Sequence, residues 1–251
     1  MSGARLVVLL CCLLAATGQA RASALDDARA GNAAQQRGDY AEAVRLYSAA
    51  IEAADLPPEL LPRVLNNRGN AFRRSNRPAL AIADYDRAIQ LRPDYALAHY
   101  NRATARMAAG DVEGAIADYD RAIALAPGRA AAYLHRGLAQ YARQRHEAAI
   151  SDFSKAIELR PAYALAYYNR GVAHAAAGHY DSAIADYTEA VRLRPGDADA
   201  LNNRGYAQEH AGRPDAAIED YRAALSVNPA HDKARLNLSR LGASLPILPR
   251  H

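Results

Sequence analysis

Asparagine recurs at one thirty-four-residue step along this 251-residue chain, and its side chain offers a definite binding chemistry. The set comprises Asn67, Asn101, Asn169, Asn203 and Asn237, and His135 interrupts it. A carboxamide carries two N–H donors and an acceptor oxygen, so it can bond to the C=O and the N–H of a peptide main chain together. Each such contact would contribute roughly 0.5 to 1.5 kcal/mol net. The alternative is a polar residue on a helix face whose bonds are satisfied by neighbouring groups of the chain.

A second recurrent polar pair combines arginine with an aspartate sixteen residues later. The pairs are Arg68 with Asp84, Arg102 with Asp118, Arg136 with Asp152, Arg170 with Asp186, and Arg204 with Asp220. Near the start of the chain both residues are replaced together, by Ala30 and Leu46. Because the two occur together or not at all, we expect an ion pair within each repeating unit. Its role is to fix geometry, since a partly buried guanidinium–carboxylate pair is specific in direction but uncertain in net stability.

Catalytic chemistry finds no support in the sequence. None of the eight histidines has a partner at the H-E-x-x-H spacing or another metal-ligand spacing, and no Gly-rich phosphate loop or G-x-S-x-G turn occurs. We therefore expect no enzyme activity, metal, cofactor or small-molecule substrate. The 31 basic and 27 acidic residues nearly balance, and the arginines are spread along the chain, which argues against a nucleic-acid partner.

The elements that position these residues follow the same period. Counting each unit from Pro62, Ala96, Ala130, Ala164 or Ala198, proline is the thirty-second residue every time. Place 24 is aromatic, and place 8 is glycine or alanine. Apolar and small residues recur at intervals of three and four residues within two stretches of each unit. This spacing predicts two helices per unit. Between them, at place 15, stand Asn76, Gly110, Gly178 and Gly212, residues that suit a left-handed helix end.

This helix-turn-helix unit, with its small, aromatic and proline places in order, resembles the tetratricopeptide repeat (TPR). The resemblance covers most of the chain and implies an all-α fold, a right-handed α-solenoid of stacked hairpins, because one hairpin cannot bury its apolar face alone. We expect a degenerate first repeat at 24–57 and further repeats at 62–95, 96–129, 130–163, 164–197 and 198–231, then a capping helix at 232–241 and a tail at 242–251.

The resemblance also implies where a ligand would lie. First helices of such repeats line the concave face, and asparagines at place 6 of relatives grip the main chain of an extended peptide. Other places on that face run from basic and polar through apolar to acidic. They read Arg63, Asn66, Asn70 and Arg73, then Tyr100, Met107, Leu134, Leu138, Tyr141, Leu165 and Tyr168, then Asp199, Asn202, Tyr206 and Glu209. An extended segment with an apolar centre and one acidic end would suit this gradient.

One subtype of the family is not expected. Chaperone-binding relatives hold a C-terminal carboxylate with lysines, an arginine and asparagines in successive repeats. Read from the first repeat, Ala28, Leu97 and Asn101 stand at the basic places, and starting one repeat later places Asn66, Ala131 and His135 there. A carboxylate clamp of that kind therefore lacks its cations.

The first residues follow different rules. Arg5 precedes an apolar run from Leu6 to Ala16, with small residues at Ala20 and Ala22, which predicts a secretory signal peptide over 1–22. About eleven apolar residues are too few for a membrane span of about twenty. Both cysteines, Cys11 and Cys12, lie within this segment. We expect export, most readily to a bacterial periplasm, with a retained signal anchor or a lipidated cysteine as the alternative.

These features together favour a non-enzymatic adaptor that binds an extended peptide or a partner's tail in its groove. The alternative is a structural module of an envelope complex that uses its outer face or its ends, with the groove empty or filled by the tail residues 245–248.

Overall fold

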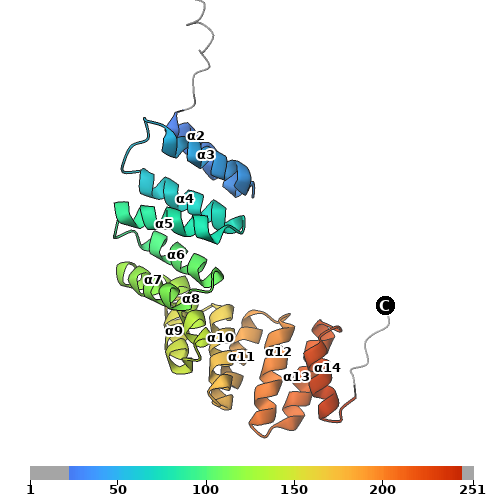
Figure 1. Ribbon diagram of the computed structural model, residues 1–251. Helices are drawn as coiled ribbons and strands as arrows, with labels where there is room; N and C mark the ends of the chain where they lie inside the picture. The colour runs from blue at the N-terminus through green and yellow to red at the C-terminus, as the bar shows by residue number, and fades with distance from the viewer. Residues whose placement is uncertain (1–22, 245–251) are drawn as a thin grey trace, which may run out of the picture. The chain divides into compact units, whose positions relative to one another are not determined.

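The computed structural model describes residues 23–244, and the predicted signal segment and the tail from residue 245 lie outside the described residues. The described chain contains helices and turns without a strand, arranged as consecutive packed hairpins (Figure 1). The expected all-α solenoid fold is therefore confirmed. None of the described helices has the length and apolar character needed to cross a membrane.

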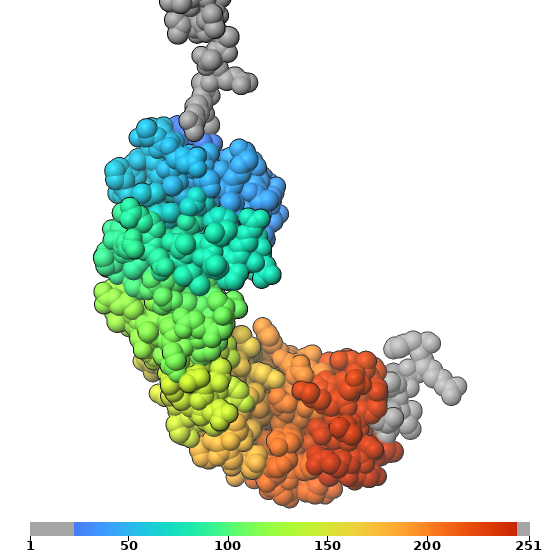
Figure 2. All heavy atoms as spheres, viewed as in Figure 1, coloured from blue at the N-terminus to red at the C-terminus, as the bar shows by residue number. Residues whose placement is uncertain are grey.

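The chain divides into two compact units, with the boundary between Leu91 and Arg92. The N-terminal unit contains α2 (Ala24–Gln36), α3 (Tyr40–Glu52), α4 (Leu61–Arg74) and α5 (Pro78–Leu91). The C-terminal unit contains α6 (Ala96–Ala108), α7 (Val112–Leu125), α8 (Ala130–Ala142), α9 (His146–Leu159), α10 (Ala164–Ala176), α11 (Tyr180–Leu193), α12 (Ala198–His210), α13 (Pro214–Val227) and α14 (Asp232–Arg240). In the space-filling view, helices that follow one another in each unit lie in direct contact (Figure 2).

The turn inside each hairpin uses a left-handed residue, as predicted. Gly110, Gly178 and Gly212 have φ between 78° and 84°, and Asn76 has a φ of 59°. A residue with positive φ ends a helix because its amide can reach back to the last free carbonyls. Gln144 occupies the same place with a φ of 58°, although a side chain disfavours this conformation.

Each hairpin closes around one aromatic ring. A Cβ added to Gly137 would lie 2.7 Å from the Phe153 ring, and one added to Gly69 would lie 2.7 Å from Tyr85. Place 8 is therefore small because the place-24 ring of the second helix rests on it. These rings are fully buried, and the alanines at places 20 and 27 beside them are also inaccessible.

The weaker first repeat closes differently. The segment between α3 and α4 carries Asp55, whose carboxylate accepts a hydrogen bond from the Ala24 amide at 3.3 Å and so binds the start of α2. Leu56 packs against the core of this hairpin. This segment therefore continues the packing of the first hairpin at the place where the other repeats carry a proline.

First helices and second helices stack differently in the C-terminal unit. Each first helix contacts the next one, from α6 through α8, α10 and α12 to α14, whereas the second helices of this unit contact first helices and not one another. Neighbouring hairpins are thus closer together on the side of their first helices than on the side of their second helices. That side, which we call the first-helix face, is the inner side of the stack within this unit.

Candidate binding face

The five predicted ion pairs are all present and hold each hairpin together. In every pair Nε and one terminal nitrogen of the arginine donate to the two carboxylate oxygens, at 2.5 to 2.9 Å. The aspartates are almost fully buried. The prediction of pairing within one repeat is therefore confirmed.

The remaining guanidinium nitrogen joins one hairpin to the previous one, a contact that the sequence pattern did not suggest. Arg136 donates to Asp120 at 2.6 Å, and Arg170 donates to Ser154 at 3.0 Å. Ser48 and Thr188 play the same part for Arg68 and Arg204. All four acceptors stand at place 25 of the preceding repeat. Their varied chemistry, carboxylate or hydroxyl, hides them from a search for identical residues.

The place-6 side chains also join neighbouring hairpins, on the first-helix face. Asn203 donates to the Tyr168 hydroxyl at 3.0 Å, and Asn237 donates to the Asn202 oxygen at 3.1 Å. In the N-terminal unit Asn67 donates to Asn32 at 3.0 Å. At the interruption, His135 Nδ1 lies 2.8 Å from the Tyr100 hydroxyl. These three asparagines therefore contribute to the stacking of hairpins, and binding of a peptide main chain by the place-6 amides stays a prediction.

The place-6 amides differ in what they leave for a ligand. Asn101 is only 6% exposed, so it offers little surface. Asn169 donates to the Leu165 carbonyl of its own helix at 2.7 Å and is partly exposed. The oxygen of Asn203 accepts from Asn202, and the oxygen of Asn237 accepts from Arg240. Since an amide has two N–H groups and two lone pairs, Asn203 and Asn237 each retain further bonding capacity.

The apolar residues expected in the groove separate into core and surface. Leu134 is 1% exposed and belongs to the hydrophobic core around Phe153, so its assignment to peptide binding was wrong. Leu138 and Tyr141 are partly buried against the same core. Tyr168 packs its ring on Tyr187 with centroids 5.9 Å apart. The repeat period could not distinguish buried residues from surface residues on this face. A side chain at a given place is buried or exposed according to the size of its neighbours.

The two arginines predicted for the early part of the face lie on α4. Arg63 is exposed, and Arg73 is partly buried. The Arg73 Nε atom has no hydrogen-bond partner among the described residues. Both belong to the N-terminal unit.

A pocket opens on the first-helix face at the end of the C-terminal unit. It has a volume of about 340 Å³ and is lined by Asn202, Asn203, Tyr206, Lys233, Leu236 and Asn237, from α12 and α14. Leu236 is 70% exposed and Tyr206 is 40% exposed. Leu238, two residues further along α14, is buried instead. The sequence left open which of these two leucines is buried, because the capping helix has no second helix to define its faces.

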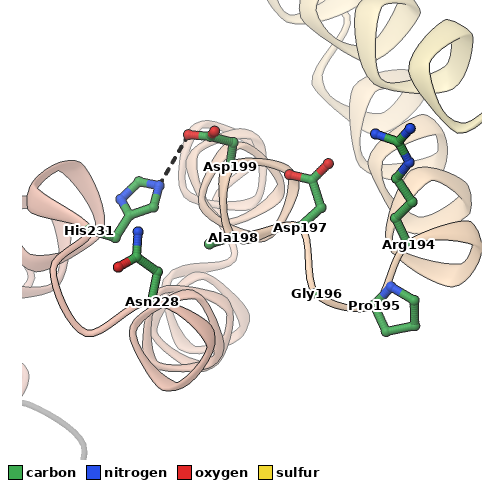
Figure 3. A pocket seen from close by; sticks show the side chains of 8 residues that line it. All are labelled: Arg194, Pro195, Gly196, Asp197, Ala198, Asp199, Asn228 and His231. Atoms are coloured by element: carbon green, nitrogen blue, oxygen red, sulfur yellow. Dashed lines mark hydrogen bonds and ion pairs between the residues drawn. The ribbon is translucent and has the colours of Figure 1, made fainter. Parts of the chain in front are cut away.

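A second cavity lies on the loop edge between repeats. It has a volume of about 460 Å³ and includes two carboxylates, Asp197 and Asp199 (Figure 3). Asp199 accepts from the ring of His231 at 3.2 Å, and His231 in turn caps α14 by accepting from the Ala234 amide. Asp197 caps α12 through the Ala200 amide. The polar groups of this cavity are thus engaged in starting helices.

Comparison with known proteins agrees with this architecture. The tetratricopeptide repeat model matches six overlapping segments, 28–96, 66–130, 100–164, 135–198, 168–234 and 210–249. The chain therefore belongs to the tetratricopeptide repeat family.

Curated relatives match over a limited length. RNA polymerase II-associated protein 3 of Xenopus laevis is 37% identical over 92 residues, 37% of this chain and 13% of that protein. The TPR repeat-containing thioredoxin TTL4 of Arabidopsis thaliana is 37% identical over 87 residues, 35% of this chain and 12% of that protein. The matched segments thus span a small part of these relatives.

Solved structures show the same fold. MamA is 27% identical, with a TM-score of 0.63 over 66% of this chain and 96% of that one. YrrB, described as a TPR protein with an unusual peptide-binding site, is 22% identical, with a TM-score of 0.66 over 76% of this chain and 96% of that one.

Proposed function

We propose that this protein is a non-enzymatic scaffold that binds an extended peptide or a partner's tail on the first-helix face. The TPR fold indicates protein–protein interaction in general terms, because stacked hairpins offer an extended surface rather than an enclosed reaction site. The finer statement, the mode of binding, rests on the surface of this chain.

The observation that carries the proposal is the distribution of exposed large apolar residues in the C-terminal unit. Three of them lie on first helices, Leu165 on α10, Tyr206 on α12 and Leu236 on α14, and one, Val227, lies on a second helix. Tyr206 and Leu236 line one pocket together with the amides of Asn203 and Asn237. Apolar surface beside fixed amide groups suits a peptide, because peptide side chains can pack on the apolar surface while the peptide main chain bonds to the amides.

The test compares three immobilised proteins for partner capture from the envelope fraction of the source cells. These are the native sequence, a Tyr206→Ala/Leu236→Ser double variant, and a Val227→Ser control. Because the substituted side chains are exposed, we expect unfolding temperatures that differ little. Proteins captured by the native chain should be lost from the double variant and retained by the control. Equal capture by all three would contradict the proposal and favour contacts through the outer face or the ends.

We further propose that the chain is exported, with the segment 1–22 removed. This rests on the order of a basic residue, an apolar run and small residues, with Ser23 as the N-cap of the first described helix. Mass spectrometry of the protein from its native cells should show an N-terminus close to Ser23 in the exported fraction. A chain that keeps Met1–Ala22, or an acylated cysteine, would contradict cleavage.

A further inference from the structure

The pocket between α12 and α14 has a single charged residue in its lining, and that residue is a lysine. Lys233 is one of two lysines among the 31 basic residues of the chain. The other, Lys155, donates to Glu158 at 2.6 Å. Lys233 makes no ion pair with any described residue, so its ammonium group is available to a ligand.

The acidic groups that flank Lys233 are engaged elsewhere. Asp232 pairs with Arg235 at 3.4 Å, and Glu209 pairs with Arg240 at 2.8 Å. Asp199 is held by His231 at the loop edge (Figure 3). An acidic side chain from outside would therefore meet an unpaired cation without displacing an existing pair.

The rest of the pocket is neutral and held in place. Asn202 is 4% exposed, and it bonds to both Asn203 and Asn237, which fixes the three amides relative to one another. Tyr206 and Leu236 add an apolar wall. A ligand therefore finds one cation, prepositioned amide groups and one apolar surface within the same cavity.

Resting on the proposed function, we propose that this pocket selects a partner segment in extended conformation that carries an acidic side chain two residues from an aliphatic one. In an extended chain, residues i and i+2 point to the same side, about 6 to 7 Å apart. Lys233 and Leu236 are three residues apart on α14, where successive side chains on one face are about 5 to 6 Å apart. The two spacings agree to within about 1 Å, so the acid meets Lys233 while the aliphatic group covers Leu236 and Tyr206.

The experiment measures two capped peptides by the fluorescence anisotropy of their own tryptophan. The chain contains no tryptophan, so excitation at the long-wavelength edge of tryptophan absorption, where its tyrosines absorb little, reports on the peptide. The probes are acetyl-Trp-Gly-Glu-Ala-Leu-Gly-amide and the same peptide with Lys for Glu. For the native chain we expect the Glu peptide to bind about threefold more tightly, because an exposed ion pair is worth up to about 1 kcal/mol. Lys233→Glu should invert the preference, and the preference should weaken in high salt.

Lys155→Glu is the matched control, since it changes the other lysine, on α9, and should leave the preference unaltered. A native chain without preference, a preference that survives Lys233→Glu, or no binding of either peptide would overturn the proposal. So would binding that appears only in a chain ended after Ser244, because the occupant would then be the chain's own tail.

These outcomes separate the two proposals. Tyr206→Ala/Leu236→Ser should weaken the binding of both peptides alike, so this variant tests whether the first-helix face binds peptides. Lys233→Glu tests only the preference for the acidic peptide. If Lys233→Glu has no effect while the double variant still loses its captured partners, the face binds without choosing an acid.

Discussion

At the scale of single residues, the turn at Gln144 is the least favourable of the hairpin turns. It holds a φ of 58°, where the equivalent turns of α6–α7, α10–α11 and α12–α13 use glycine. A side chain in the left-handed region costs about 1 to 2 kcal/mol, and glycine avoids that cost although it has more freedom to lose on folding.

Gln144→Gly should therefore raise the free energy of unfolding by about 0.5 to 1 kcal/mol, the difference between the strain relieved and the extra freedom that glycine loses on folding. Urea denaturation measures it. Gln140→Gly, inside α8, is the control and should lower stability by about 1 kcal/mol. A loss of stability in both variants would show that the Gln144 side chain contributes more than its backbone costs.

Acid sensitivity is also a property of single residues. Burial alone would raise the pKa of Asp118, but the His99 ring 3.8 Å away, the hydrogen bonds from Arg102 and the charge of Arg106 lower that pKa below its usual value. An aspartate with a lowered pKa stabilises the fold above its unfolded pKa of about 4, and this contribution is lost as the pH falls further.

Asp118→Asn should consequently be less stable than the native chain at pH 7, with a smaller difference between the two at about pH 2 to 3. Thermal unfolding across this range follows the effect. Asp215→Asn, at an exposed site, should track the native chain throughout. A difference between native and Asp118→Asn that stays constant with pH would show that the carboxylate charge is not responsible.

Residue roles were only partly predictable from the sequence. The pairing of Arg136 with Asp152 followed from the joint presence of the two residue types in each unit. The bonds of Asn203 and Asn237 did not, because their partners belong to another repeat and differ in type. A thirty-four-residue step shows which residues are equivalent, but the distance between neighbouring hairpins decides which of them touch.

At the scale of the element, one ring per hairpin determines how closely its two helices approach. Phe153 is fully buried and lies against Gly137, with alanines packed around it. Removing such a ring leaves a cavity that the helix backbones cannot close without moving, and the usual cost is about 3 to 5 kcal/mol.

Phe153→Ala should thus destabilise the chain by about 3 to 5 kcal/mol, whereas Leu165→Ala, at a 40% exposed position, should cost far less. Equilibrium denaturation compares the two. Similar losses would mean that the α8–α9 hairpin does not depend on its ring.

Helix positions were the most predictable feature. The turn residues and the recurring prolines marked where the helices end. The small residues and the one aromatic residue of each unit indicated where its two helices pack together. The region around Asp55 was less predictable, because its role depends on a bond to Ala24 at the other end of the repeat. At the cap, Leu236 and Leu238 could not be assigned to the surface and the core without the second helix that other repeats supply.

At the scale of the whole molecule, the contacts of each compact unit lie within a hairpin or between hairpins that follow one another. Stability of such a chain is approximately a sum of hairpin terms and junction terms, so a local defect need not spread. The helix α14 buries Ala234 and Leu238 against Leu201, Tyr221 and Leu225, which would otherwise face solvent.

A chain ended after Pro229 should accordingly show faster amide exchange in α12 and α13, with α2 to α4 unchanged. Hydrogen exchange with mass spectrometry reads both regions in one experiment. Faster exchange throughout the chain would show that the hairpins unfold as one cooperative body, contrary to the nearest-neighbour description.

The third guanidinium nitrogen of Arg170 and of Arg204 has a consequence for how such a chain changes over generations. Arg170 reaches Ser154, and Arg204 reaches Thr188, across the same sixteen-residue interval. Loss of residues 164–197 would bring Arg204 to Ser154, a combination that the chain already uses. Duplication or loss of a complete unit therefore recreates a working junction, so the length of the array can vary without the invention of a new interface.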